Sequence, residues 1–133
     1  MWNVTSFSEL RKDAENTKRW NVMHQKNKHK QSYLEQCITN SDIPTVAVSD
    51  YVKLVTEQIG PYVPGPYYAL GTDGFGRSDT RENLRHFFEV DRYYIILFAI
   101  RALVNDNKLD EAVINKVIKK YNIDINKPNP LDV

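Results

Sequence analysis

The stretch from Tyr67 to Asp91 constrains the fold more than any other part of the chain. A short apolar run, YYAL, enters a turn that holds three of the five glycines, and a helix-forming segment follows from about position 80. An apolar run, a glycine-rich turn and a capped helix in direct succession are typical of a strand–turn–helix unit. The glycines of this turn are Gly71, Gly74 and Gly76. We therefore expect the rest of the chain to pack around this unit.

The remaining patterns predict strands and helices in alternation. Strands are predicted over 2–6, 45–48 and 67–71, which are rich in β-branched and aromatic residues. Helices are predicted over about 7–15, 32–38, 51–59, 80–89, 92–104 and 111–121. This alternation favours an α/β fold with a largely parallel sheet.

Polar side chains at the expected helix starts support these boundaries. Two pairs have the spacing of a capping box, Ser6 with Glu9 and Ser32 with Glu35. The other predicted caps are Ser49-Asp50, Ser78 or Asp79, Asp91 and Asp110. Each such side chain has an oxygen that can accept a hydrogen bond from a free N–H group of the first helical turn.

Length and charge exclude several classes of protein. The 133 residues correspond to one domain at the usual length of about 100–200 residues. A net charge of +1 provides no field that attracts nucleic acid or an anionic membrane, so neither is expected as a partner. The longest apolar run, 93–100, is shorter than the stretch of about 20 residues that spans a bilayer, and no signal peptide is predicted at the N-terminus. The single cysteine, Cys37, cannot form an intrachain disulfide, which fits a cytoplasmic location.

The glycine turn has two interpretations. Glycines between a strand and a helix can form a phosphate cradle, because the free N–H groups of a helix start attract anions. The detailed patterns fail, since a dinucleotide fingerprint needs glycine where Asp73 stands and a P-loop needs lysine where Arg77 stands. The other interpretation is a turn that needs glycine for positive φ angles or for close backbone contact. The spacing favours the turn and leaves the anion site open.

Three carboxylates in and after the turn, Asp73, Asp79 and Glu82, also have two interpretations. Their chemistry suits acid–base catalysis or magnesium binding. The alternative, which we favour, is that Asp79 caps the following helix and that Glu82 complements the helix dipole.

Two arginines one turn apart, Arg81 and Arg85, border the apolar seam of the same helix. The seam consists of Leu84, Phe87 and Phe88. Arginines in such places either anchor a second surface through bidentate ion pairs or remain solvated charges. The sequence leaves both interpretations open.

The other polar residues give no pattern of a catalytic or metal site. His24, His29 and His86 lack the spacing of metal ligands, and Cys37 is predicted to belong to the core. The lysine-rich segment 24–31 is interpreted as a solvated loop, with a patch for an anionic partner as the alternative. No aromatic residue is interleaved with these lysines for base stacking. No catalytic, cofactor-binding or metal-binding residue is therefore predicted.

One long run closely resembles the C-terminal domain of the homodimeric bacterial pyruvate dehydrogenases: GTDGFGRSDTRENLR at 71–85, followed by FEVD at 88–91. The likeness covers nearly the whole chain and includes VTSF at 4–7, RWN at 19–21, SDY at 49–51, YVP at 62–64 and NID at 122–124. The long run is specific to this family, whereas its GxDxFGxS theme is shared more loosely with transketolases. One departure is Phe87, because the family commonly has a second histidine after His86.

The resemblance implies part of a three-layer α/β/α domain of the transketolase C-terminal type. The family's sheet is mixed and five-stranded, so residues 1–133 are expected to form a single partial domain with the last three strands. One of the family's earlier strands lies between the strands expected here at 2–6 and 45–48. Unpaired N–H and C=O groups beside such a gap cost about 1–3 kcal/mol each if they are buried.

The same resemblance implies an enzyme that oxidatively decarboxylates pyruvate on thiamine diphosphate and transfers acetyl to the lipoyl group of a dihydrolipoyl acetyltransferase core. The family binds thiamine diphosphate and magnesium in two earlier domains, whose motifs this chain lacks, so the isolated chain is expected to be inactive and to bind neither. Its expected role is support of a homodimer. The candidate interface or interdomain contacts are Asp73, Arg77, Asp79, Arg81, Arg85 and His86. Two alternatives stay open: a standalone α/β module that binds an anion or a partner, and a non-functional gene fragment.

Overall fold

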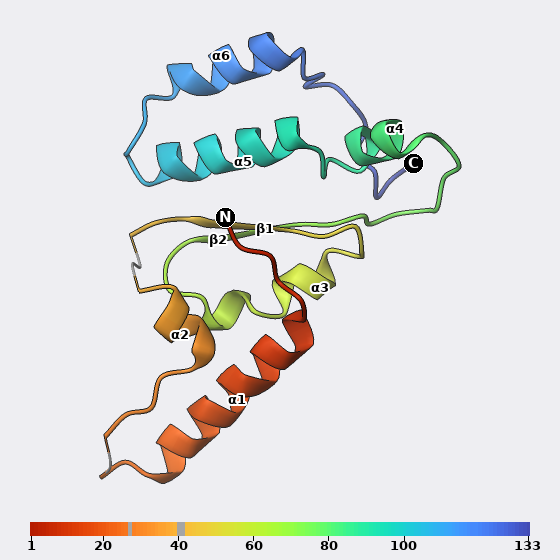
Figure 1. Ribbon diagram of the computed structural model, residues 1–133. Helices are drawn as coiled ribbons and strands as arrows, with labels where there is room; N and C mark the ends of the chain where they lie inside the picture. Colours follow the sequence, from red (N-terminus) through yellow and green to blue (C-terminus); the bar gives the residue numbers. More distant parts are fainter. Residues whose placement is uncertain (27, 40–41) are drawn as a thin grey trace.

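Two short parallel strands lie at the centre of the fold (Figure 1). The computed structural model describes residues 1–26, 28–39 and 42–133. Strands β1 (Thr45–Val48) and β2 (Tyr67–Leu70) pair in register, with Thr45 opposite Tyr67. They are the only strands in the part of the chain that the structure describes. Both were predicted, and β2 ends one residue before the predicted boundary.

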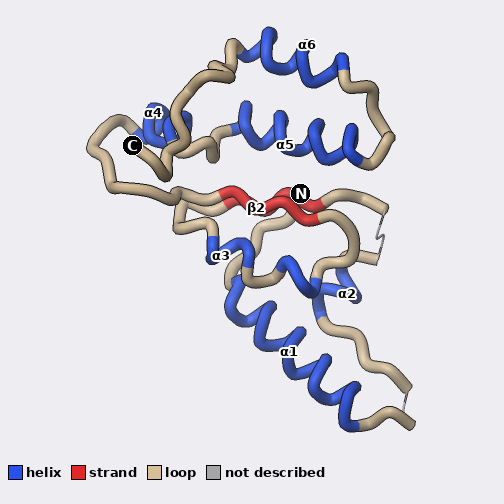
Figure 2. The backbone as a smooth tube through the Cα atoms, turned by 180° about the vertical axis from the view of Figure 1, so that it is seen from behind, coloured by secondary structure: helices blue, strands red, loops and turns tan. Residues whose placement is uncertain are grey.

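Helices lie on both sides of this strand pair. They are α1 (Phe7–Met23), α2 (Tyr33–Cys37), α3 (Leu54–Glu57), the 3-10 helix η1 (Gly60–Tyr62), α4 (Arg81–Phe87), α5 (Arg92–Asn105) and α6 (Ala112–Tyr121). Figures 1 and 2 show α5 and α6 on one side of the strands and α1, α2 and α3 on the other. Parallel strands joined through helices make this an α/β fold, as the alternation predicted.

The strand predicted over 2–6 is wrong. This segment forms no ladder, and Trp2 is 61% exposed. A strand needs a neighbour that pairs with its N–H and C=O groups, and no described residue pairs with this segment. The chain therefore forms two of the three expected strands.

Two helix boundaries also differ from the prediction. Helix α1 continues well past position 15, because the segment 16–23 contains no glycine or proline. It ends where the N–H of His24 bonds to the Trp20 carbonyl at 3.0 Å and the His24 ring lies 2.9 Å from the same oxygen. The helix predicted over 51–59 shortens to α3 followed by η1, because loop contacts described below hold its first residues in a non-helical conformation.

Three of the predicted caps are confirmed. The Ser6 hydroxyl accepts a hydrogen bond from the N–H of Glu9 at 3.2 Å. Ser32 and Glu35 form both halves of a capping box at the start of α2. The Asp91 carboxylate accepts hydrogen bonds from two N–H groups of the first turn of α5, at 2.8 and 3.0 Å.

The caps predicted for α4 and α6 are wrong in position. Helix α4 is capped by Thr80 rather than by Ser78 or Asp79, because the Thr80 hydroxyl accepts a hydrogen bond from the N–H of Asn83 at 3.3 Å. The Asp79 carboxylate accepts hydrogen bonds from the N–H of Thr80 and from the side-chain amide of Asn83. At α6 the cap position belongs to the residue after Asp110. The Asp110 carboxylate still accepts a hydrogen bond from the N–H of Ala112 at 2.7 Å.

Apolar side chains are buried on both sides of the strands. On the α1 side, Leu34, Ile59 and Val63 form a cluster. Partly buried residues that pack against it are Phe7, Leu10, Ile38, Tyr62 and Tyr67. On the α5 side, the buried residues include Tyr94, Ala102, Ile114 and Ile123. The two sides leave the ends of the strands uncovered for the loops that follow them.

Candidate functional site

The residues singled out in the sequence gather where the two parallel strands end. Parallel strands have their carboxyl ends at the same edge, so the loops that follow them meet there. The loop after β1 covers 49–53, and the loop after β2 covers 71–80. Helix α4 begins directly after the second loop (Figure 1).

The first part of the glycine turn is hydrogen-bonded to the loop after β1. The N–H of Thr72 donates a hydrogen bond to the Tyr51 carbonyl at 2.9 Å, and its hydroxyl donates one to the Asp50 carbonyl at 2.9 Å. The Asp73 carboxylate accepts a hydrogen bond from the N–H of Lys53 at 2.8 Å. A Cβ atom at Gly71 would overlap the backbone of Lys53, so glycine is required for this contact. At Gly71 the glycine is thus explained by close backbone approach, and Asp73 acts as a structural acceptor.

The second glycine, Gly74, faces the C-terminal tail. Its φ is +104°, and an added Cβ would overlap the carbonyl oxygen of Pro130, which is itself buried. Gly76, in contrast, has open space around it. The turn is therefore held between the loop after β1 and the tail.

Lys127 fixes the tail to the end of α4, and the sequence analysis did not single it out. Its ammonium donates to the Phe87 carbonyl at 2.6 Å and to the Glu89 carboxylate at 2.8 Å. The Lys127 side chain is only 14% exposed. These partners lie 40 and 38 positions away in the chain, so no local spacing could have indicated the contact.

Both arginines of α4 point to one carboxylate. Arg85 Nη2 lies 3.0 Å from Oδ2 of Asp50 and 3.4 Å from Oδ1, and Arg81 Nη2 lies 4.0 Å from the same Oδ2. Asp50 is thus an ion-pair partner and not the predicted helix cap. The Arg81 side chain is 80% exposed. Such exposed pairs contribute at most about 1 kcal/mol, and Arg81 keeps donors free for another surface.

Arg77 and Asp79 lie beside a small cavity next to α4. The cavity measures about 220 Å³ and is lined by Arg77, Ser78, Asp79, Asn83, Leu84 and Phe87. The Arg77 guanidinium lies 3.9 Å from the centre of the Phe87 ring. Hydrogen bonds from the Asn83 amide and the Thr80 N–H hold the pKa of the Asp79 carboxyl below its ordinary value. Asp79 therefore serves the local structure of the loop.

His86 lies apart from the arginines. Its Nδ1 is 2.8 Å from Oδ2 of Asp91, and its ring centre is 5.5 Å from that of Tyr94. The histidine thereby ties α4 to the start of α5. The structure therefore places Asp73, Arg81 and Arg85 around the loop after β1, Arg77 and Asp79 beside the cavity, and His86 at the α4–α5 junction.

Exposed apolar side chains accompany these charges. Tyr51 and Val52 are exposed on the loop after β1, and Phe75 at the tip of the glycine turn is 78% exposed. Arginine and aromatic side chains together are enriched at protein–protein interfaces. The surface therefore suits contact with another protein surface, whereas its carboxylates are occupied by internal hydrogen bonds.

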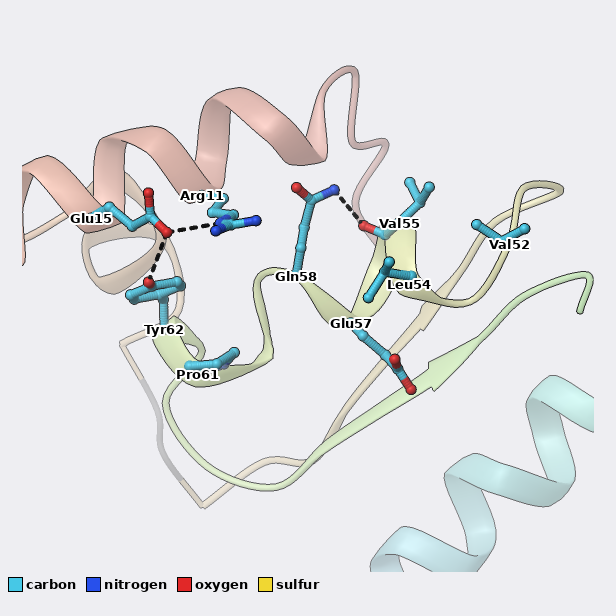
Figure 3. A pocket seen from close by; sticks show the side chains of 9 residues that line it. All are labelled: Arg11, Glu15, Val52, Leu54, Val55, Glu57, Gln58, Pro61 and Tyr62. Carbon is cyan, nitrogen blue, oxygen red and sulfur yellow. Dashed lines mark hydrogen bonds and ion pairs between the residues drawn. The ribbon is translucent and has the colours of Figure 1, made fainter.

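A larger open groove lies between α1 and the α3–η1 segment, as Figure 3 shows. It measures about 420 Å³. Arg11 Nε lies 2.8 Å from the Glu15 carboxylate, which also accepts a bond from the Tyr62 hydroxyl at 3.4 Å. The arginine is the main cause that holds the pKa of Glu15 below its ordinary value. The lining contains no serine, cysteine or histidine, so it offers no nucleophile–base pair.

The described residues fit a metal ion poorly. Within 1–26, 28–39 and 42–133, no group of three His, Cys, Asp or Glu side chains could hold a metal ion. Asp73 and Asp79, the carboxylates of the glycine turn, both accept hydrogen bonds within the fold.

No described helix is long and apolar enough to cross a bilayer.

The fold and this loop cluster define an α/β domain whose parallel strands end in a polar, hydrogen-bonded surface. The transketolase-like TK C-terminal domain family matches residues 1–91, which is more than half of the chain. The chain belongs to this family.

Relatives extend the similarity over the whole chain. The chain is 45% identical over 133 residues to the pyruvate dehydrogenase E1 component of Cupriavidus necator. The aligned region covers 100% of this chain and 15% of that protein. The same component of Pseudomonas aeruginosa is 49% identical over 99% of this chain, and that of Escherichia coli is 46% identical over 98%. The chain thus spans about 15% of the length of the relatives that it matches.

Proposed function

We propose that this chain is the C-terminal support and dimerisation segment of a pyruvate dehydrogenase. The observation that carries the proposal is the similarity to pyruvate dehydrogenase E1 components along the whole chain. The exposed Arg81 guanidinium and the exposed Phe75 ring near the end of the strands agree with it, because arginine and aromatic side chains are enriched at protein–protein interfaces. On this proposal the chain alone is inactive.

In the longer protein, the reaction is the oxidative decarboxylation of pyruvate followed by acetyl transfer to a lipoyl group. Thiamine diphosphate and magnesium are bound by parts of that protein outside this segment. The protein is a cytoplasmic homodimer, and its macromolecular partner is the dihydrolipoyl acetyltransferase core. The name of the relatives supports the reaction, and the 15% share of their length supports binding of the cofactor outside this segment.

The proposal also concerns the edge of strand β1 that does not pair with β2. The N–H groups of Thr45 and Ser49 bond toward β2, so the N–H and C=O groups of Val46 and Val48 point to the other edge of β1. We propose that a strand of the longer protein pairs with this edge. This strand and two others then complete a five-stranded sheet in a three-layer α/β/α domain, and unpaired groups on β1 gain partners.

Removal of the α4 arginines tests the dimer role. In the full enzyme that carries this segment, Arg81→Ala and Arg85→Ala are each expected to raise the dimer dissociation constant by about tenfold or more, because charge pairs buried at an interface contribute about 2–5 kcal/mol. Arg85 is already oriented by Asp50, and Arg81 has free donors. Analytical ultracentrifugation over a dilution series gives the constant.

Arg101→Ala is the matched control, because Arg101 forms a surface ion pair with Glu111 at 3.6 Å on another part of the fold. Its dissociation constant should equal that of the unmodified enzyme. Unchanged constants for both Arg81→Ala and Arg85→Ala would contradict the dimer role of α4.

A further inference from the structure

The segment 16–34 contains five basic residues and no aspartate or glutamate. We call these five residues the basic tip: Lys18, Arg19, Lys26, Lys28 and Lys30. The whole chain has a net charge of +1, so the remainder carries more acidic than basic residues. The small net charge therefore conceals a strong local concentration of positive charge.

The basic tip stands away from the body of the fold. It occupies the second half of α1 and the segment that returns toward α2, and Figures 1 and 2 show this end of α1 projecting away from the strands and from α5 and α6. All five cationic side chains are exposed. A partner could approach this end without displacing any other element.

Among the described residues, no cation of the basic tip is paired with a carboxylate, whereas eight of the thirteen Lys and Arg residues elsewhere are. The eight paired cations are Arg11, Lys12, Lys53, Arg81, Arg85, Arg101, Lys108 and Lys127. Like charges held close together repel one another, so an acidic partner would relieve this repulsion.

Side-chain contacts hold the basic tip in place. Asn21 accepts a hydrogen bond from the N–H of Lys30 at 2.9 Å and donates one to the Lys30 carbonyl at 2.9 Å. The Trp20 ring stacks on His24 with centres 4.3 Å apart, and the Lys30 ammonium lies 3.9 Å from the Trp20 ring centre. These contacts preorganise the charges, which lowers the entropic cost of binding.

We propose that the basic tip binds an acidic segment of another polypeptide. Exposed Val22 and Met23 lie between its cations and offer apolar contact, which a peptide side chain can use. Nucleic acid fits less well, because Trp20 is already engaged by His24 and Lys30 and is not free to stack on bases. The inference goes beyond the proposed function and does not depend on it.

Trp20 provides an internal probe for the test. The chain has two tryptophans, so Trp2→Phe leaves Trp20 as the only one. Titration of this variant with a glutamate-rich peptide containing interspersed leucines should change the Trp20 fluorescence. The dissociation constant should rise at least about tenfold between about 50 mM and about 300 mM salt, because screening weakens exposed charge pairs.

Replacement of three lysines of the basic tip by glutamate (Lys26, Lys28 and Lys30) should weaken binding of the acidic peptide at least about tenfold.

The matched control reverses Lys116, Lys119 and Lys120 on α6, which changes the net charge equally and should leave the affinity unchanged. An absent fluorescence response, or an equal response to a glutamine-rich peptide, would overturn the proposal. Tighter binding of a single-stranded oligonucleotide than of the acidic peptide would overturn the choice of a polypeptide partner. Circular dichroism of each variant ensures that lost binding is not lost folding.

Discussion

At Gly71 the two loops at the end of the strands approach so closely that one methyl group would overlap the Lys53 backbone. Gly71→Ala is therefore expected to lower the free energy of unfolding by about 1–3 kcal/mol, the usual cost of overpacking. Gly76→Ala is the control, because nothing lies within 4 Å of a Cβ at that position. Urea unfolding of both variants measures the difference. Equal stability of Gly71→Ala and the unmodified chain would show that the loops are not in this contact.

Tyr67 makes the stability depend on alkaline pH. Its hydroxyl donates to the Thr56 carbonyl, and burial, with a smaller effect of the Glu57 charge, raises its pKa from 10.0 to about 12. The folded chain thus holds the phenol proton more tightly than the unfolded chain. The resulting stabilisation is complete below pH 10 and is lost as the pH rises toward 12.

Tyr67→Phe should make this alkaline loss shallower, as measured by urea unfolding at a series of pH values. Burial also raises the pKa of Tyr94 to about 12, so part of the loss should remain. Tyr51→Phe, which alters an exposed tyrosine, should leave the profile unchanged. A Tyr67→Phe profile with the original slope would contradict the assignment to Tyr67.

Single residues were predicted well from the sequence where their partners are local. The caps Ser32 and Asp91 bond within their own helix start, so spacing alone identified them. Asp50 and Lys127 were missed because their partners lie 35 or more positions away. Of the candidate residues, Arg85 pairs with Asp50, which was predicted to cap a helix instead.

At the scale of elements, Asp91 joins two helices. It caps α5 and also contacts His86 at the end of α4. Asp91→Ala is expected to lower the free energy of unfolding by about 1–2 kcal/mol through loss of the cap. Asp106→Ala removes only a surface pair with Lys108 and should change it by less than about 0.5 kcal/mol. Thermal unfolding followed by circular dichroism compares the two, and an equal effect would contradict the role of Asp91.

Strands were predicted correctly where each had a neighbour within the chain. β1 and β2 pair with each other, and both predicted runs are strands in the structure. The run at 2–6 has a similar composition but no described partner, and it forms no strand. Strand formation depends on pairing as well as composition, which is why a local pattern was insufficient there. Helix α1 was predicted too short. It continues to Met23 because no glycine or proline in 16–23 stops it.

At the scale of the whole molecule, the described residues form a two-stranded parallel sheet covered by helices, with two charged surfaces beside it (Figure 1). The edge of β1 offers unpaired ladder groups, the α4 surface offers arginines, and the basic tip offers cations without counter-charges. Such features are stabilised when other polypeptide segments cover them. The family could be predicted from the long glycine-containing run. For the lysine-rich segment 24–31 the sequence left a solvated loop and a patch for an anionic partner open, and the structure adds that its cations project away from the strands (Figure 1).

The most direct test of the central claim is a replacement experiment. This chain is substituted for the matching 131 residues of the Escherichia coli pyruvate dehydrogenase E1 component, and pyruvate-dependent acetyl transfer is measured together with the oligomeric state. The same protein without that segment is the control and should be inactive. A support and dimerisation segment predicts a dimer with activity within about tenfold of the unmodified enzyme. A folded chimera that is monomeric or inactive would contradict the claim.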